Sequence, residues 1–329
     1  MLGRSFGFLI LISQICFLLV SPRYKTVWPF SIYYHRIFVP ILKDNSRHRW
    51  KFHIVPLFYL SLYTYVVLLY YLRLHKAVFA HITMFENFVL IPFFVLSILY
   101  LGLATMLIKP QNSLNNKQAM NSHFEYDNII YYPDTVCRTC RVAKPARSKH
   151  CTICNKCVLI QDHHCIWANN CIGLGNYIYF YSFLIDNTLA LSYGFVRLFF
   201  LTIAGDVELP RAALTLSILL GVFAIILAVF TYIELSIVAE GMTTNEQDKW
   251  YMVQNFMRDG NLVRDSRGNY YFMEPNQDGV IKNTSRFFST NSYDHTAYNL
   301  TDFTVVTDAS EIPNIYDKGS FWENLKVLI

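Results

Sequence analysis

Seven cysteines and three histidines are crowded between Cys137 and Cys171, in the stretches CRTC, HCTICNKC and DHHCIWANNC. Cysteine and histidine hold zinc in closed tetrahedral sites, and short Cys-x-x-Cys pairs are typical of such sites. Two closed sites need eight ligands, so a window with ten such groups leaves two to spare. A cysteine and a histidine left over would be the nucleophile and the base that thiol catalysis requires.

The stretch Asp162-His163-His164-Cys165 offers that pair in one place. Cys165 is the candidate thiol, a neighbouring histidine is the candidate base, and Asp162 is suited to fix the tautomer of that base. The second histidine is then free to bind metal. The alternative is a purely structural zinc module, as in ubiquitin-ligase fingers, in which all ten groups are zinc ligands or unused extra residues. It has to be considered because most Cys/His clusters are structural.

Long apolar runs surround this window, and they give the chain the composition of a membrane protein. Hydrophobic residues make up 53% of the 329 residues, and charged residues only 16%. A spanning helix needs about 20 mostly apolar residues, and five runs are candidates: residues 6–20, 54–72, 88–108, 177–204 and 212–239. The first run is short enough to be a secretory signal. No small-x-small cleavage site follows it, which favours an uncleaved anchor.

Lysine and arginine concentrate in two loops, between the first and second runs and between the third and fourth. Cytosolic loops carry such an excess, so both loops are predicted to be cytosolic, with a lumenal N-terminus and a cytosolic C-terminal tail. Disulfides are disfavoured in the cytosol, which supports metal binding or catalysis by the cysteines. The eighth cysteine, Cys16, lies alone in the first run and is expected to be a small apolar residue there.

The predicted fold is an all-α polytopic membrane protein with about five transmembrane helices, and a cytosolic zinc-bound cysteine-rich domain between the third and fourth. Its regions are an N-terminal anchor with the first transmembrane helices (1–108), the cysteine-rich zinc domain (109–176), the last two transmembrane helices (177–239) and the cytosolic tail (240–329). Charges inside spans are costly and are more often paired or functional than idle. We expect a polar contact within the bundle for Asp186, whereas Arg197 and Glu234 lie near span ends, where they could reach the interface.

The window from Cys137 to Cys171 resembles the cysteine-rich domain of the DHHC protein S-acyltransferases, integral membrane enzymes that attach palmitate to protein cysteines. TTNE, residues 243–246, resembles the TTxE motif of that family, and NIYDKGSFWENL, residues 314–325, resembles its C-terminal motif. The chain departs from the family where Lys109-Pro110 replaces the usual Asp-Pro-Gly, where Ile166 replaces the usual proline, and in its fifth span. Both TTNE and Ser320-x-x-Glu323 also fit a capping box at the start of a helix.

The resemblance implies an assignment of the site residues. His163 would be the base beside the nucleophile Cys165, Asp162 would orient it, and Thr244, Tyr316 and Asn324 would support the site. Two structural zinc ions are implied as cofactors, with palmitoyl-CoA as the acyl donor. One zinc would be held by Cys137, Cys140, His150 and Cys157, and the other by Cys151, Cys154, His164 and Cys171.

Within the family the chain resembles members that act at the endoplasmic reticulum. The resemblance therefore implies a multi-pass protein of that membrane, in contact with the lipid bilayer. It also implies substrates that are membrane proteins with juxtamembrane cysteines, such as SNAREs, and no nucleic-acid partner. Two other classes stay open from the residues alone: a membrane-anchored ubiquitin ligase and a transporter with a cytosolic zinc sensor. A thioester-linked acyl group on the protein would distinguish the acyltransferase from both.

Overall fold

Long apolar helices dominate the computed structural model, which describes residues 13–14, 16–43, 48–115, 124–204, 210–274 and 286–329. Among these residues, four helical segments are long and apolar enough to cross a membrane: Arg49–His81, Glu86–Leu107, Tyr177–Ile203 and Arg211–Ala239. They coincide with four of the five expected spans. The remaining run, residues 6–20, lies for the most part outside the described residues.

The chain divides into two compact units, Met1–Leu60 and Ser61–Ile329. The first contains helix α2 (Phe30–Tyr33), a π-helical segment (Tyr34–Lys43), a 3-10 turn (Arg49–His53) and the start of α3 (Ile54–Leu69). Within it, Lys51 Nζ donates to the carbonyls of Ile41, at 3.0 Å, and Leu42, at 2.6 Å. Lys51 therefore satisfies carbonyls at the end of the π-helical segment, which have no partner inside their own helix.

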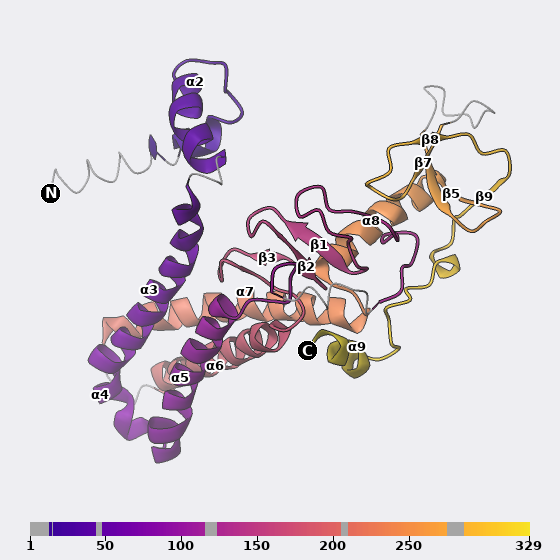
Figure 1. The fold of residues 1–329 in the computed structure, drawn as a ribbon. Coiled ribbons are helices and arrows are strands. Elements are labelled where there is room, and N and C mark those ends of the chain that lie inside the picture. The colour runs from indigo at the N-terminus through magenta and orange to yellow at the C-terminus, as the bar shows by residue number, and fades with distance from the viewer. Residues whose placement is uncertain (1–12, 15, 44–47, 116–123, 205–209, 275–285) are drawn as a thin grey trace. The chain divides into compact units, whose positions relative to one another are not determined.

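The second unit contains the helices that pack around the candidate site. The helix that begins as α3 continues through Tyr70–Leu74, α4 (His75–Val78) and Phe79–His81, and α5 (Ile91–Leu107) follows the π-helical turn Glu86–Leu90. Helix α6 (Tyr177–Ala204) packs against both α5 and α7 (Arg211–Ala239), as Figure 1 shows. Small residues allow this close approach: a Cβ on Gly221 of α7 would lie 2.9 Å from the ring of Phe195.

The cysteine-rich region consists of two short hairpins joined to the ends of these helices. Strands β1 (Ser148–Cys151) and β2 (Lys156–Leu159) pair antiparallel, as do β3 (His164–Cys165) and β4 (Asn170–Cys171). The side-chain amide of Asn170 donates to the carbonyls of Thr105, at 2.9 Å, and Ile108, at 2.8 Å. This hairpin is thus anchored on the C-terminal end of α5, whose last carbonyls need such partners.

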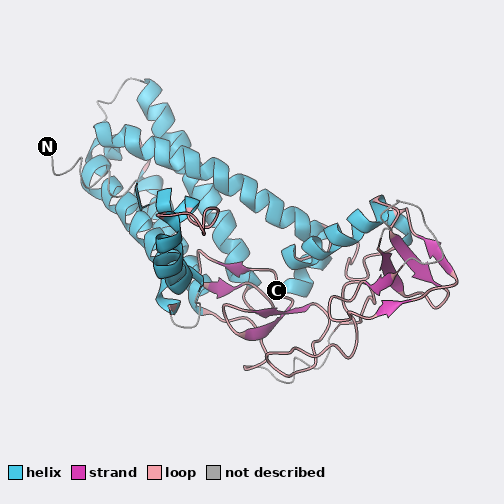
Figure 2. Cartoon of the chain, turned by 90° about the horizontal axis from the view of Figure 1, so that it is seen from above, coloured by secondary structure: helices cyan, strands magenta, loops and turns pink. Residues whose placement is uncertain are grey.

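The tail is not helical throughout, and the prediction of an all-α chain is wrong for it and for the cysteine-rich region. Helix α8 (Thr244–Arg258) leads into a five-stranded antiparallel sheet in the order β8-β7-β6-β5-β9, and α9 (Phe321–Leu328) ends the chain. Figure 2 shows the strands in magenta. Aromatic and branched side chains, which favour strands, fill much of the sheet: β5 (Leu262–Asp265), β6 (Tyr270–Met273), β7 (Phe287–Ser289), β8 (Ala297–Tyr298) and β9 (Phe303–Val305). A 3-10 turn, Ala309–Glu311, follows it.

Candidate active site

Each hairpin of the cysteine-rich region places one histidine directly opposite one cysteine. His150 pairs with Cys157 across β1 and β2, and His164 pairs with Cys171 across β3 and β4. Residues opposite each other in an antiparallel pair have Cβ atoms about 5 Å apart. Strand pairing therefore brings half of each predicted ligand set together.

Cys-x-x-Cys turns complete both sets. The amide of Cys140 lies 3.4 Å from Cys137 Sγ, and the amide of Cys154 lies 3.3 Å from Cys151 Sγ. Such N–H groups stabilise a thiolate ligand, because hydrogen bonds to a charged form favour that form. In each cluster the four ligating atoms lie within 4.8 Å of one another: Cys137, Cys140, His150 and Cys157 in the first, and Cys151, Cys154, His164 and Cys171 in the second.

The spacing of these atoms fits tetrahedral zinc. With Zn–S bonds of about 2.3 Å and Zn–N bonds of about 2.0 Å, the ligand atoms should lie roughly 3.5–3.8 Å apart. His164 Nδ1 lies 3.6, 3.4 and 3.6 Å from the sulfurs of Cys151, Cys154 and Cys171. His150 Nδ1 lies 3.3–3.9 Å from those of the first cluster. Both clusters are compatible with zinc, and each has four protein ligands with no open position.

The alternation of side chains along β3 explains how neighbouring residues serve different purposes. Successive side chains of an extended strand point to opposite faces. His164 takes part in the second cluster, so His163 and Cys165, on either side of it, share the other face. The amide of Ile172 bonds to the carbonyl of His163 at 2.9 Å, which continues the pairing back to that residue. The two histidines of the DHHC stretch are therefore separated by backbone geometry.

His163 has the partners expected of a base beside a thiol. Its Nδ1 lies 2.7 Å from Asp162 Oδ2, and its ring meets Phe180 edge-on with centroids 5.5 Å apart. Burial alone would lower the pKa of His163, but hydrogen bonds with Asp162 and Cys165 outweigh it and raise the pKa to about 10. His163 therefore binds a proton strongly, and a cationic imidazole stabilises negative charge on the sulfur beside it. Cys165 itself is 9% exposed.

Asp162 is held on its other side by the start of α8. The backbone amide of Thr244, the first residue of that helix, donates to Asp162 Oδ1 at 2.5 Å. The positive end of the helix dipole also favours an anion there. The resemblance implied that Thr244 supports the site. The contact is made by the backbone, and the hydroxyl of Thr244 has no hydrogen-bond partner among the described residues.

TTNE also forms the capping box that its spacing predicts. Thr243 Oγ1 accepts from the amide of Glu246 at 3.2 Å, and Glu246 Oε2 accepts from the amide of Thr243 at 2.9 Å. Gly241, just before this helix, has φ +68°, and a Cβ there would lie 2.5 Å from Cα of Asp317. The close packing of the tail against the turn between α7 and α8 therefore requires glycine at this position.

Sequence reasoning missed the buried ion pair between Arg147 and Glu246. Arg147 Nε and Nη2 donate to the two carboxylate oxygens of Glu246, at 2.7 and 2.6 Å, and the side chains are only 2% and 1% exposed. Burial opposes a charge on Arg147, but the Glu246 carboxylate more than compensates and raises the pKa of the guanidinium. The pair fastens the strand that leads to the first cluster onto α8. The residues are far apart in sequence, so no spacing could have linked them.

The two C-terminal residues that the resemblance singled out join the tail to the helices and to Arg147. Tyr316 donates from its hydroxyl to the carbonyl of Glu125 at 2.9 Å, and its ring lies 4.7 Å below the Arg147 guanidinium. Asn324 donates to the carbonyl of Ala239, the last residue of α7, at 3.2 Å and to Asp317 at 2.9 Å. These contacts hold α9 against the end of α7, next to α8.

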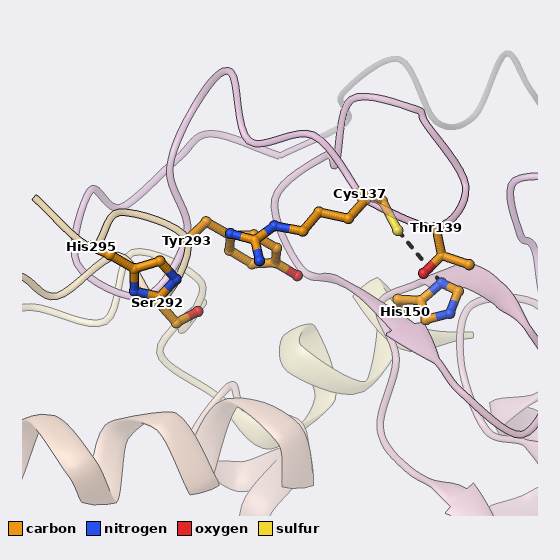
Figure 3. Close-up of a pocket in the computed structure, with 7 residues that line it drawn as sticks. Cys137, Thr139, His150, Ser292, Tyr293 and His295 are labelled. Atoms are coloured by element: carbon orange, nitrogen blue, oxygen red, sulfur yellow. Dashed lines mark hydrogen bonds between the residues drawn. The ribbon is translucent and has the colours of Figure 1, made fainter.

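A cavity beside the first cluster is the place where another part of the tail meets the cysteine-rich region. Figure 3 shows the Tyr293 and His295 side chains of the tail on one side of it, and Cys137 and His150 on the other. Lys144 Nζ donates to the Tyr293 hydroxyl at 2.7 Å and lies 4.6 Å from the centre of its ring. The residues that line the cavity are Cys137, Arg138, Thr139, His150, Ser292, Tyr293 and His295.

The charged residues inside the apolar helices are paired or buried. Ser97 donates to Asp186 at 2.6 Å between α5 and α6, which confirms the expected polar contact. Arg197 pairs with Glu86 at 2.7 Å. Glu234 of α7 is only 4% exposed, so the alternative in which it reaches the membrane interface is wrong. Its carboxylate belongs to a group with Asp162 and His163, whose oxygen and nitrogen atoms lie within 4.8 Å of one another.

The fold and the site together define a class of protein. Residues 130–251 match the family model of the DHHC palmitoyltransferases. The Asp162–His163–Cys165 arrangement and both clusters lie within that match. The chain belongs to the DHHC palmitoyltransferase family and is a protein S-palmitoyltransferase. This family decides between the acyltransferase and the two alternative classes, the ubiquitin ligase and the transporter.

Individual relatives match along nearly the whole chain. Palmitoyltransferase SWF1 of Saccharomyces cerevisiae is 48% identical, with 98% of each chain covered. The protein of the same name from Candida glabrata is 44% identical, again over 98% of each chain. That from Kluyveromyces lactis is 41% identical, over 97% of this chain and 96% of its own. The likeness thus extends beyond the cysteine-rich region to the apolar helices and the tail.

Proposed function

We propose that this chain transfers palmitate from palmitoyl-CoA to protein cysteines through an acyl-enzyme at Cys165. The observation that carries the proposal is the placement of Cys165 beside His163, whose Nδ1 lies 2.7 Å from Asp162. The other six cysteines between Cys137 and Cys171 belong to the two metal clusters. Cys165 is the thiol in this region that remains for chemistry.

In the first step, His163 takes the proton of the Cys165 thiol, and the resulting thiolate attacks the thioester carbonyl of palmitoyl-CoA. The C–S bond to CoA breaks, and His163 returns the proton to the departing CoA thiolate. A positioned base of this kind contributes about 10²–10⁴-fold to the rate. Asp162 keeps the ring in one orientation through the hydrogen bond to Nδ1.

In the second step, the thiol of a substrate cysteine attacks the acyl-enzyme. His163 takes the proton of that thiol and then protonates the Cys165 sulfur as the new thioester forms. No other reactant is consumed, because one thioester is exchanged for another in each step. Splitting the transfer into two thioester exchanges is the usual advantage of covalent catalysis.

Zinc has a structural role in this scheme. Bound zinc would tie the CRTC turn to the first hairpin through Cys137, Cys140, His150 and Cys157, and would tie the two hairpins to each other through Cys151, Cys154, His164 and Cys171. Catalytic zinc sites keep an open position, and these clusters have four protein ligands each. His164 lies between His163 and Cys165 in sequence, so fixing it on a metal also fixes the residues that react.

The acyl chain would lie among the apolar helices. The hairpin that carries Cys165 is hydrogen-bonded to the end of α5, and Phe180, near the start of α6, packs beside His163. Each methylene moved out of water contributes about 0.8 kcal/mol. A long acyl chain is therefore favoured in the membrane, while the charged CoA portion remains in water near the cysteine-rich region.

We assign supporting roles to three further residues. Thr244 holds Asp162 through its backbone amide, Tyr316 packs under Arg147, and Asn324 joins the tail to the end of α7. They are positioning residues in this scheme.

The proposed setting is the endoplasmic reticulum membrane, with the cysteine-rich region and tail in the cytosol. The excess of lysine and arginine in the loop that contains the clusters supports that orientation. Substrates would be membrane proteins with cysteines next to their spans, SNAREs among them. Loss of thioester-linked palmitate from SNAREs in cells without this chain is expected, and unchanged SNARE palmitoylation would exclude them as substrates.

The proposed chemistry is tested by incubating the purified full-length chain with labelled palmitoyl-CoA. A label that stays on the denatured protein and is released by neutral hydroxylamine is expected. The label should map to Cys165. A hydroxylamine-sensitive label found on another cysteine, or no covalent label at all, would refute the acyl-enzyme proposed here.

A further inference from the structure

A membrane helix contributes a carboxyl group to the candidate active site. Glu234 lies in α7, near its end at Ala239, and only 4% of it is exposed. The oxygen and nitrogen atoms of Glu234, Asp162 and His163 lie within 4.8 Å of one another. The neighbouring side chains of α7 are predominantly apolar, so a buried carboxyl group is costly there unless it is hydrogen-bonded. The group that its position brings within reach is Asp162.

Asp162 already accepts two N–H groups from two different elements. Thr244 donates from the backbone at 2.5 Å, and His163 donates from Nδ1 at 2.7 Å. Two buried carboxyl groups this close do not both stay charged without a large cost. Asp162 has the N–H donors that stabilise a negative charge, so a proton shared by the two carboxyl groups would lie on Glu234, which is close enough to donate it to Asp162 as a third hydrogen bond.

The same three residues could in principle hold a metal ion. An ion bound to this trio would compete with the hydrogen bond between His163 and Asp162, which is fully formed at 2.7 Å. It would also take the ring away from the neighbouring Cys165 side chain. The geometry is that of a hydrogen-bonded network rather than of an ion site.

We propose that Glu234 is a positioning residue for acyl transfer, which holds Asp162 from α7 while Thr244 holds it from α8. The inference rests on the proposed roles of Asp162, His163 and Cys165. Fixing Asp162 from both helices fixes the His163 ring against the Cys165 thiol. Glu234 therefore affects how fast the acyl-enzyme forms and leaves the binding of palmitoyl-CoA unchanged.

The test compares Glu234→Gln with Glu234→Met in the full-length chain. Glutamine keeps an N–H donor for Asp162, whereas methionine fills similar space without one. Losing a hydrogen bond to a charged group typically costs about 10–100-fold. We expect Glu234→Met to lower the maximal rate of acyl-enzyme formation about 10–100-fold, with an unchanged KM for palmitoyl-CoA and unchanged zinc content. Glu234→Gln should stay within about threefold of the unsubstituted chain, because the donor is retained.

Glu240→Met serves as the matched control, because Glu240 is exposed directly after α7 and is not part of the group formed by Asp162, His163 and Glu234. It should leave the rate unchanged. If Glu234→Met loses zinc or fails to fold, Glu234→Asp takes its place, since it withdraws the carboxyl by one methylene. The same fall in maximal rate at constant KM is expected.

Three outcomes would overturn the inference. They are equal rates for the methionine, glutamine and unsubstituted chains, equal losses in the methionine and glutamine variants, and a change confined to KM. Acyl-enzyme formation by the unsubstituted chain distinguishes an error in the inference about Glu234 from an error in the proposed function. If it forms no acyl-enzyme at Cys165, the function itself is wrong. If it does and the Glu234 variants deviate from expectation, only the inference about Glu234 is wrong.

Discussion

The two hairpins of the cysteine-rich region have the same spacing and different outcomes. HCTICNKC, residues 150–157, and HCIWANNC, residues 164–171, both begin with His-Cys and end with the cysteine that lies opposite the histidine. In the first hairpin, Cys151 follows the histidine and belongs to the second cluster. In the second hairpin, Cys165 occupies the same place and belongs to neither cluster.

The difference teaches that a shared local fold can either use a thiol as a ligand or leave it reactive. In both strands the residue after the histidine points away from the cluster that the histidine serves. On that side Cys151 meets the other three ligands of the second cluster, whereas Cys165 meets His163 and, through it, Asp162. The reactive cysteine is therefore defined by the side chains that it meets on its own face of the strand and not by its spacing in the sequence.

The largest expected effect separates the adjacent histidines of the second hairpin. His164→Ala should lose the second zinc and with it the fold of the region, because metal binding contributes directly to folding. His163→Ala should keep both zinc ions and form the acyl-enzyme about 10²–10⁴-fold more slowly. Metal analysis and acylation rates on the same preparations measure both. Equal zinc content in the two variants would show that the division between the histidines is wrong.

The next effect concerns the ion pair that fastens the first hairpin to α8. Arg147→Met leaves Glu246 buried without its partner, which should lower the free energy of unfolding by about 3–5 kcal/mol. The control is Lys326→Met, which breaks the exposed pair with Glu323 and should cost at most about 1 kcal/mol. Thermal unfolding in detergent compares the two variants. Similar losses would contradict a dominant role for the buried pair.

The smallest effects lie at the start of α8, where the two threonines should differ. Thr243→Val removes the cap and should cost about 0.5–2 kcal/mol of stability. Thr244→Val should leave both stability and acylation nearly unchanged, because the contact with Asp162 comes from the backbone amide. Unfolding temperatures and acylation rates measure the two effects. A strong loss of acylation in Thr244→Val would mean that the hydroxyl matters after all.

Thr244→Pro gives a sharper version of that comparison. Proline is tolerated at the first position of a helix, and Thr243 has the extended backbone, with ψ 161°, that suits a residue before proline. The substitution removes the amide hydrogen that Asp162 accepts and leaves the helix in place. Acyl-enzyme formation should slow roughly 10–100-fold, in line with a lost hydrogen bond to a charged group.

The sequence predicted the parts whose signals are local. Four apolar runs were long enough to predict membrane-spanning helices. In the cysteine-rich region, counting the ligands of two zinc sites left one cysteine and one histidine over. The spacing of Thr and Glu in TTNE predicted a capping box, and the structure contains it. Each of these predictions depends on residues within a few turns or a short window of one another.

The sequence did not predict features that depend on tertiary contact or on very short strands. Strands β3 and β4 have two residues each, which is too short for an alternation of apolar and polar residues to be recognised in the sequence. The hairpin of β5 and β6 could have been found, because aromatic residues follow a short turn that contains Gly268. Arg147 with Glu246 and Glu234 with Asp162 come from distant parts of the chain, so only the fold reveals them.

The most direct test of the central claim substitutes the two equivalent cysteines of the hairpins. Cys165→Ala and Cys151→Ala are measured for zinc per chain and for hydroxylamine-sensitive acylation by palmitoyl-CoA. We predict that Cys165→Ala folds, retains both zinc ions and forms no acyl-enzyme, whereas Cys151→Ala loses the second zinc. Acylation that persists without Cys165, or zinc that is lost with it, would contradict the account.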